Sequence, residues 1–395
     1  MSQQLINRSS DLKRLRDEGY DVEVRANHLV IKNVPYVNSS KEIKFGLLVS
    51  ELTLAGDITT APNTHVAMFS GEHPCHKDGS ELIQIKHASN RQQLGDGLVV
   101  DHSFSSKPTS GRYADFYEKM TTYVAIVSAP AQSIDPSVTA RVFPAIPSDA
   151  DEDSVFHFID TASSRAGINA IGEKLSLEKV GIVGLGGTGS YVLDLVAKTL
   201  IREIHLFDGD IFSQHNAFRS PGAPSLDDLQ KRLPKVEHFR EKYSQMRKQI
   251  VSHNGYITSE NVEQLRDMNF VFLCLDNGAS RRLLVEKLEE FGIPFIDVGM
   301  GIQQVDGALG GILRITISTE AQRDCARLRI PLSEDDGNNE YSQNIQLADL
   351  NALNASLAVI KWKKLFGFYR DLENEFHCTY TIDGNVMTNE INNGT

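Results

Sequence analysis

Six polar side chains near the ends of apolar segments have the types needed to bind a charged ligand. They are Asp208, Asp210, Asn216, Arg219, Lys235 and Asp276. The acids follow two apolar segments, 203–207 and 270–275, which are predicted strands. Because ligands of open α/β sheets bind at the carboxyl ends of strands, we expect the three carboxylates at one edge of a sheet. Carboxylates hold Mg²⁺, and Arg and Lys neutralise phosphate oxygens, so the set suits a nucleoside triphosphate with magnesium.

A glycine-rich turn lies upstream of these residues. It contains Gly184, Gly186, Gly187 and Gly189 and is followed by Ser190. The apolar strand 180–183 precedes the turn, and a predicted helix begins at Ser190. A tight turn of this kind lets ligand phosphates approach the bare backbone, and the helix amino terminus behind it offers free N–H groups to an anion. The segment therefore predicts a nucleotide site.

The glycine turn and Asp208 alone would also permit an NAD(P)-dependent oxidoreductase. Asp208 comes about 20 residues after the glycines, where an acid hydrogen-bonds a ribose. Three further polar residues follow Asp208: a second acid, an asparagine (Asn216) and an arginine (Arg219). Hydride transfer has no obvious use for them. These later residues favour ATP, and the oxidoreductase stays as an alternative.

Taken in order, these motifs resemble those of the ubiquitin-activating-enzyme-like superfamily, the ThiF/MoeB/HesA adenylyltransferases. The pattern of that family is GxGGxGS, then DxD, then an Asn and an Arg, a later Lys and a DNxxxR segment. This chain supplies every part of the pattern in order, and its last part runs from Asp276 through Asn277 to Arg281. The resemblance covers roughly residues 160–385.

The resemblance implies that ATP and Mg²⁺ are used to adenylate the carboxyl-terminal glycine of a ubiquitin-like or sulfur-carrier protein. Carried over by position, Asp208 would hold the ribose and Asp276 the magnesium ion. The phosphates would be held by Asn216, Arg219 and Lys235. The expected nucleotide site is completed by Gly184, Gly186, Gly187, Gly189, Ser190, Asp210 and Asn277. The attacking carboxylate is already ionised, so the reaction needs cations and accurate positioning rather than a general base.

Relatives also use an arginine from a segment ahead of the glycine turn, often lent across a dimer. Arg165 is the candidate here, although its spacing to the turn is shorter than usual, and a solvated arginine at a helix end is the alternative. The predicted helix 344–366 carries Leu350, Leu353, Leu357 and Ile360 at helical spacing. A core stripe is the simplest explanation for these side chains. Relatives dimerise partly through such helices, so we expect a homodimer.

The four cysteines form no CxxC pair, so the structural zinc site of many relatives cannot be built. So few cysteines, without an apolar leader, indicate a cytoplasmic location. Some relatives form a thioester with the carrier protein, and Cys325 is the expected nucleophile because Arg323 and Arg327 would stabilise its thiolate. The residues 333–339 that follow are a predicted mobile loop. The alternative is an ordinary exposed cysteine in an enzyme that only adenylates.

Prolines and an acidic run at 144–153 are typical of a linker and divide the chain. We expect a smaller α+β amino-terminal domain over 1–150 that docks a partner or the carrier. We expect an adenylyltransferase domain over 160–395. Strands alternate with helices in the second domain, which predicts an α/β fold with a Rossmann-like, doubly wound and mostly parallel sheet of ThiF type.

The expected elements of the amino-terminal domain are a helix at 10–18, a strand pair at 22–31, and strands at 45–54, 65–69 and 123–128. His73-Pro74-Cys75 is similar to the His-Pro-x signature of ubiquitin-conjugating enzymes. In that family a catalytic cysteine follows several residues later, and residues 80–84 supply none. A non-catalytic relative of that fold is therefore one interpretation of this domain.

The formal net charge of −12 argues against a nucleic-acid partner. No stretch approaches about 18 consecutive apolar residues, so no transmembrane helix is expected. The large amino-terminal module favours an activating enzyme of a bacterial protein-conjugation or defence system, with a conjugating enzyme as a further partner. A sulfur-carrier adenylyltransferase of cofactor biosynthesis is the alternative.

Overall fold

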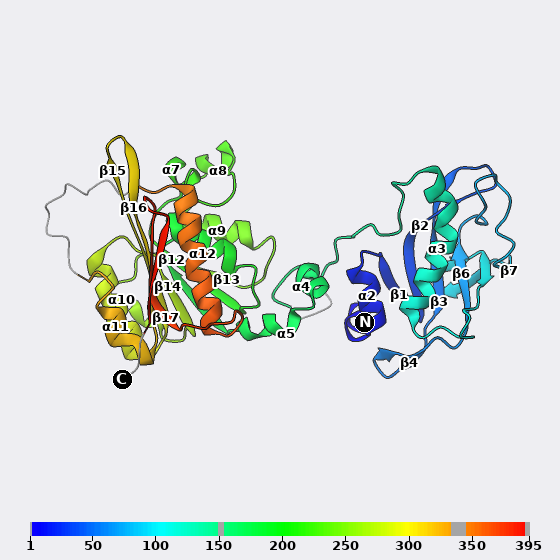
Figure 1. The fold of residues 1–395 in the computed structure, drawn as a ribbon, viewed down its shortest axis with the longest axis horizontal. Coiled ribbons are helices and arrows are strands. Elements are labelled where there is room, and N and C mark those ends of the chain that lie inside the picture. Colours follow the sequence, from blue (N-terminus) through cyan, green and yellow to red (C-terminus); the bar gives the residue numbers. More distant parts are fainter. Residues whose placement is uncertain (1, 149–153, 333–344, 392–395) are drawn as a thin grey trace. The chain divides into compact units, whose positions relative to one another are not determined.

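The computed structural model describes residues 2–148, 154–332 and 345–391. The chain forms two compact units (Figure 1). The amino-terminal unit comprises residues 1–154 and 158–167, and the carboxyl-terminal unit comprises residues 155–157 and 168–395. No helix of the described residues is long and apolar enough to cross a bilayer.

The amino-terminal unit contains an antiparallel six-stranded sheet in the order β1-β2-β3-β6-β10-β7, and the long helix α3 packs on it. Its helices are α1 (Ser2–Arg8), α2 (Ser10–Asp17), α3 (Phe116–Ile134) and α4 (Thr161–Ala166). Its strands are β1 (Val22–Arg25), β2 (His28–Val37), β3 (Ile43–Glu51), β4 (Leu54–Ala55), β5 (Ile58–Thr59), β6 (Val66–Ser70), β7 (Lys86–Ala88), β8 (Gln92–Gly95), β9 (Leu98–Val100) and β10 (His102–Ser105).

Most predicted elements of this unit form. The predicted helix at 10–18 is α2, and it buries Leu12 and Leu15. The strand pair is β1 and β2, joined by Ala26 and Asn27, which both have positive φ as a tight hairpin turn requires. The predicted strand at 123–128 is wrong, because these residues lie within α3. Residues with high strand propensity turn helical there because they bury one face of α3 against the sheet.

The carboxyl-terminal unit contains an eight-stranded sheet in the order β13-β12-β11-β14-β15-β16-β17-β18. Its strands are β11 (Lys179–Val183), β12 (Glu203–Asp208), β13 (Ile250–Asn254), β14 (Phe270–Leu273), β15 (Phe295–Val305), β16 (Ala308–Ser318), β17 (Glu375–Thr381) and β18 (Val386–Ile391). Its helices are α5 (Asn169–Gly172), η1 (Glu173–Leu175), α6 (Gly187–Val196), α7 (Gln214–Ala217), α8 (Leu226–Gln230), α9 (Lys235–Tyr243), η2 (Val262–Leu265), α10 (Gly278–Phe291), η3 (Glu320–Gln322), α11 (Arg323–Arg327) and α12 (Ala348–Leu365).

Strands β13, β12, β11, β14 and β15 are parallel, and β15 to β18 pair antiparallel. Alternate residues of the central strands face opposite layers of helices. Val180 and Ile182 of β11 join the core that contains α6, α9 and α12, whereas Val183 joins the core that contains α10. The sheet is therefore doubly wound and mostly parallel, as predicted, and a smaller α+β domain precedes it. The strand order reverses between β11 and β14, where ligands of such sheets bind.

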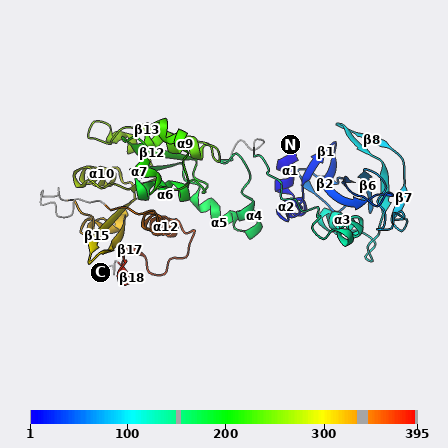
Figure 2. The same cartoon turned by 90° about the horizontal axis from the view of Figure 1, so that it is seen from above.

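Helix α12 crosses one face of this sheet beside α6 (Figures 1 and 2). It forms residues 348–365 of the predicted helix 344–366; residues 345–347 are not helical, and residue 344 lies outside the described residues. The leucine stripe is not its core face, because Leu350, Leu353 and Leu357 are only half-buried and Ile360 is exposed. The buried face instead carries Asn351, Asn354, Ala355, Ala358 and Trp362. Small residues there allow α12 to approach α6 closely.

Candidate functional site

The glycine turn connects β11 to α6 at the point where the strand order reverses. Gly184 has a positive φ of 89°, and a Cβ at this position would lie 2.4 Å from the carbonyl oxygen of Cys274. A Cβ at Gly189 would lie 1.9 Å from the carbonyl oxygen of Gly184. A Cβ at Gly186 would meet no described atom within 4 Å, so open space lies above the turn there. Gly184 and Gly189 are therefore needed for close packing, and Gly186 leaves the backbone open to a ligand.

Helix α6 begins at Gly187, earlier than the predicted Ser190. Ser190 is fully buried, and its hydroxyl donates a hydrogen bond of 2.7 Å to the carbonyl oxygen of Gly187. The side chain therefore stabilises the turn from within. The amino terminus of the helix faces the carboxyl edge of the sheet, where it can attract an anion.

Asp208 joins the glycine turn to the second acid of the DxD motif. Its Oδ2 accepts a hydrogen bond of 2.6 Å from the backbone N–H of Leu185, and its Oδ1 accepts one of 2.8 Å from that of Asp210. The buried Lys235 at the start of α9 places its Nζ 2.6 Å from Oδ2 of Asp210 and 3.6 Å from Oδ2 of Asp208. One cation therefore links both acids.

Tyr256 was not anticipated from the sequence, and it lies among all three acids. Its hydroxyl donates a hydrogen bond to Oδ1 of Asp210. This bond, burial and the charges of Asp210, Asp208 and Asp276 raise the pKa of Tyr256 to about 12. Burial raises the pKa of Asp210, but hydrogen bonds from Lys235 and Tyr256 outweigh that effect and leave its pKa below the usual range. Asp208 ends β12 and Asp276 follows β14, the parallel strands on either side of β11, so the structure brings the three acids to one edge of the sheet.

Two further buried donors follow the DxD motif and lack an acceptor among the described residues. Asn216, on α7, is buried and its Oδ1 accepts a hydrogen bond of 2.9 Å from the backbone N–H of Ser213. Within the described part of the chain, neither Nδ2 of Asn216 nor the buried Nε of Arg219 has a hydrogen-bond partner. The positive charge of Arg219 acts on the carboxylate of Asp210 and helps to lower its pKa. Buried donors of this kind are expected to meet acceptor oxygens of a ligand.

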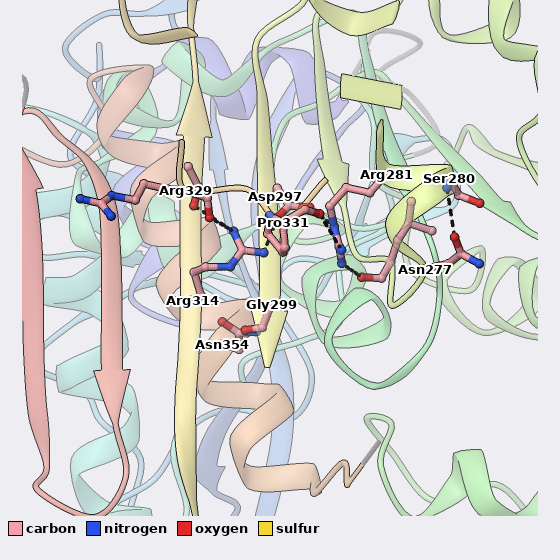
Figure 3. A network of polar contacts seen from close by, with 11 residues as sticks. Asn277, Ser280, Arg281, Asp297, Gly299, Arg314, Arg329, Pro331 and Asn354 are labelled. Carbon is pink, nitrogen blue, oxygen red and sulfur yellow. Dashed lines mark hydrogen bonds and ion pairs between the residues drawn. The ribbon is translucent and has the colours of Figure 1, made fainter. Parts of the chain in front are cut away.

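A buried ionic network holds the strand end that precedes Asp276 (Figure 3). Arg281 of α10 donates to the carbonyl oxygen of Leu275 and, at 2.9 Å, to Oδ1 of Asp297 on β15. Oδ2 of Asp297 accepts a hydrogen bond of 2.5 Å from Arg314 on β16. Asp297 was not predicted as a site residue, although an acid within the apolar segment 295–298 is a visible signal.

Asn277 is the N-cap residue of α10. Its Oδ1 accepts a hydrogen bond of 3.1 Å from the backbone N–H of Ser280. An asparagine in this position caps a helix by satisfying one of its free N–H groups. Together with Arg281, the cap fixes the start of α10 immediately after Asp276.

Cys325 lies on the short helix α11 and is half-buried against the core of the carboxyl-terminal unit. Arg327, one of its two expected neighbours, forms an ion pair with the buried Glu289. Its charge is therefore shared with a carboxylate, which removes support for the idea that it stabilises a thiolate. The predicted loop 333–339 lies outside the described residues.

Arg165 belongs to the amino-terminal unit, at the end of α4. It is exposed, and its guanidinium lies 5.0 Å from the centroid of the Phe143 ring. His73-Pro74-Cys75 belongs to the same unit, where the backbone N–H of Cys75 donates a hydrogen bond of 2.7 Å to the carbonyl oxygen of Val37 on β2. Cys75 is buried, so the motif anchors a loop to the sheet.

Comparisons with known proteins agree with this geometry. Residues 132–387 match the ThiF family, and residues 10–161 match a domain of unknown function, DUF6791. No match was found among curated proteins.

Three solved structures are among those to which this chain is similar. PaaA is 18% identical, with 56% of this chain and 75% of PaaA covered and a TM-score of 0.43. MccB of E. coli, solved with ATP, is 18% identical, with 58% of this chain and 69% of MccB covered and a TM-score of 0.42. TcdA, the tRNA N6-threonylcarbamoyladenosine dehydratase of E. coli, is 21% identical, with 52% of this chain and 92% of TcdA covered and a TM-score of 0.40. The family match spans well over half of the chain and includes the whole glycine turn and the acidic edge. The chain therefore belongs to the ThiF family, whose members are ATP-dependent adenylyltransferases.

Proposed function

We propose that this protein uses ATP and Mg²⁺ to adenylate the carboxyl-terminal glycine of a ubiquitin-like carrier protein. The observation that carries the proposal is the set of unsatisfied donors beside the acidic edge, Nδ2 of Asn216 and Nε of Arg219. A nicotinamide dinucleotide would need only the glycine turn and Asp208. A triphosphate supplies many more acceptor oxygens, which suits these donors and the buried Lys235.

In this reaction the carboxylate of the carrier attacks the α-phosphorus of ATP. A new acyl–phosphate bond forms, the bond to the bridging oxygen breaks, and pyrophosphate leaves with that electron pair. Asn216, Arg219 and Lys235 bind the phosphates and neutralise the charge that develops on them. Asp208 orients the ribose, while the amino terminus of α6 attracts the phosphates. The protein contributes binding and orientation, and no proton has to be removed from the carrier.

Among the described residues no three metal-binding side chains gather at one point, so the protein would supply a magnesium ion at this edge with one or two ligands. Mg²⁺ is usually bound by one or two carboxylates together with substrate phosphates and water. Asp276 would hold the ion, and Asp208 and Asp210 lie within electrostatic reach of the same tyrosine hydroxyl. When bound, the ion would neutralise phosphate charge.

The adenylated carrier would then react further by one of two routes. We propose that Cys325 accepts the activated carrier as a thioester and passes it to a conjugating enzyme of a bacterial conjugation or defence system, in the cytoplasm. The amino-terminal unit would dock the carrier or that enzyme, and a non-catalytic conjugating-enzyme-like fold is one form it could take. Direct use of the adenylate in sulfur transfer for cofactor biosynthesis is the alternative.

The test is ATP–pyrophosphate exchange with a panel of ubiquitin-like proteins that end in glycine. We expect exchange that requires both Mg²⁺ and a carrier, and we expect Asp276→Ala to abolish nearly all of it because the metal loses a ligand. Glu286→Ala, an exposed acid on α10, is the matched control and keeps full exchange. Retained exchange in Asp276→Ala would contradict the role of Asp276. Tight binding of NAD without binding of ATP would contradict the proposed function itself.

A further inference from the structure

Two asparagines stand on the buried face of α12. Asn351 and Asn354 are fully buried, one helical turn apart, at the start of a stripe that continues with Ala355, Ala358 and Trp362. Amides are rarely placed in such a stripe unless their polar atoms are satisfied, because burial removes their hydrogen bonds to water. Both positions therefore need an explanation.

Asn351 contacts the first turn of α6. Its Oδ1 accepts a hydrogen bond of 2.9 Å from the hydroxyl of Thr188. Its Nδ2 faces Gly187, where a Cβ would lie only 2.1 Å from that nitrogen. The second glycine of the GG pair is therefore required by this amide, and the hydroxyl of Thr188 holds the amide in place.

The Nδ2 group of Asn351 is a buried donor without an acceptor among residues 2–148, 154–332 and 345–391. Asn354 differs, because its Nδ2 donates a hydrogen bond of 3.2 Å to the carbonyl oxygen of Gly299, and its atom without a partner among the described residues is the acceptor Oδ1. Asn351 thus resembles Asn216 and Arg219, whose unsatisfied atoms are also donors. All three lack the same kind of partner, an oxygen with free lone pairs.

The surroundings of Asn351 favour an anion as that partner. The first N–H groups of α6 have no acceptor within the helix, and Gly186 at the N-cap has no side chain to satisfy them. The first turns of α6 and α12 lie together, since Asn351 contacts Gly187 and Thr188. The positive ends of two helix dipoles therefore meet at this point.

We propose that Nδ2 of Asn351 donates a hydrogen bond to a phosphate oxygen of the bound nucleotide. This inference rests on the proposed function and adds a residue from α12 to the phosphate site. It also gives α12 a role in nucleotide binding, because the helix brings a hydrogen-bond donor from a distant part of the sequence to the glycine turn. The carboxyl-terminal tail of the carrier also has acceptor oxygens, in its carbonyl groups. It is the competing partner for Nδ2 of Asn351, and the experiment distinguishes it from the nucleotide.

The test is calorimetric binding of ATP with Mg²⁺, and of adenosine, to the full chain without a carrier. Asn351→Leu keeps the branched shape and removes the donor. We expect its Kd for ATP to rise about tenfold, the size of one hydrogen bond to a charged group, while its Kd for adenosine stays unchanged. Asn351→Asp should weaken ATP binding further, since it places a negative charge beside the phosphates. Asn354→Leu is the matched control and should keep the ratio of the two Kd values.

Thr188→Val provides a second variant that does not alter Asn351 itself. It removes the bond that orients the amide, so we expect a smaller loss of ATP affinity in the same direction. Equal ATP affinity in Asn351→Leu and the wild type would overturn the inference, and so would an unchanged ATP affinity with a raised KM for the carrier. Absence of ATP binding in the wild type would overturn the proposed function and, with it, this inference.

Discussion

At the scale of single residues, Lys235 is the buried cation that links the two acids of the DxD motif. It is buried and bonded to both Asp208 and Asp210. Replacement by methionine removes the cation and leaves two carboxylates facing the phosphates. The pKa of Asp210, which hydrogen bonds from Lys235 and Tyr256 hold below its usual range against the effect of burial, should then rise.

We predict that Lys235→Met weakens ATP binding by about ten- to a hundredfold, the range expected for a lost hydrogen bond to a charged group. Calorimetry with ATP and Mg²⁺ measures the change. Lys231→Met removes the same charge from an exposed ion pair with Asp228 and should stay within about twofold of the wild type. Equal losses of ATP affinity in both variants would show that the net charge of the protein, and not the position of Lys235, determines the affinity.

Cys325 is the residue on which the thioester step depends. Because adenylation uses the phosphate site and transfer uses a thiolate, the two steps should separate in one variant. We predict that Cys325→Ala keeps ATP–pyrophosphate exchange but loses a carrier adduct that thiol reductants cleave. Gel electrophoresis with and without reductant detects the adduct. If the adduct survives in Cys325→Ala, the nucleophile is another cysteine, and if the wild type forms none, the enzyme only adenylates.

At the scale of elements, α12 presents two different faces. Its small and polar residues are buried against α6, whereas Leu350, Leu353 and Leu357 are half-buried and Ile360 is 43% exposed. Apolar side chains left on the outer face of a helix provide a surface for a second subunit. The expected homodimer through the carboxyl-terminal domain stays a prediction, and the exposure of this stripe leaves its side chains available for a second subunit.

We predict that light scattering finds a symmetric dimer and that Ile360→Glu shifts it toward monomer, because a charge would be buried in the interface. Leu372→Glu changes an apolar side chain that is 71% exposed outside α12 and should leave the dimer intact. A monomeric wild type with full exchange activity would contradict the dimer. It would also weaken a role for Arg165 across an interface.

At the scale of the whole molecule, buried histidines make stability depend on pH. Burial lowers the pKa of His205, His253, His238 and His377 in the carboxyl-terminal unit. Nδ1 of His205 lies 3.0 Å from Nε2 of His253, a hydrogen bond that both rings can share only while one nitrogen is unprotonated. The unfolded chain takes up protons below about pH 6.5, before the folded chain does, so stability falls as the pH drops through that value.

We predict that the denaturation midpoint of the carboxyl-terminal unit is lower at pH 5.5 than at pH 7.5. The single tryptophan, Trp362, is buried in the core of this unit, so its fluorescence reports the unfolding of this unit alone. Each unit of pKa depression costs about 1.4 kcal/mol at low pH. His205→Gln should flatten the dependence, while His87→Gln, an exposed change in the other unit, should not. An unchanged midpoint across this range would contradict the prediction.

The sequence by itself determined the class of site and of fold. Glycine spacing and the order of acids, amide and cations are local chemical requirements of a nucleotide turn, and strand–helix alternation dictates a doubly wound sheet. These features need no knowledge of distant contacts. The helix at 116–134 was partly mistaken for a strand because its aromatic and β-branched residues suit either element until packing chooses.

Only the tertiary structure decided which groups meet. Tyr256 reaches Asp210, Asp297 binds both Arg281 and Arg314, and Asn351 reaches the glycine turn, although each pair is far apart in sequence. The predicted core face of α12 was wrong because leucines and small residues both recur at helical spacing, and the close packing of α12 against α6 buries the face with the small residues. Contacts of this kind follow from the packing of separate elements, which local sequence patterns do not encode.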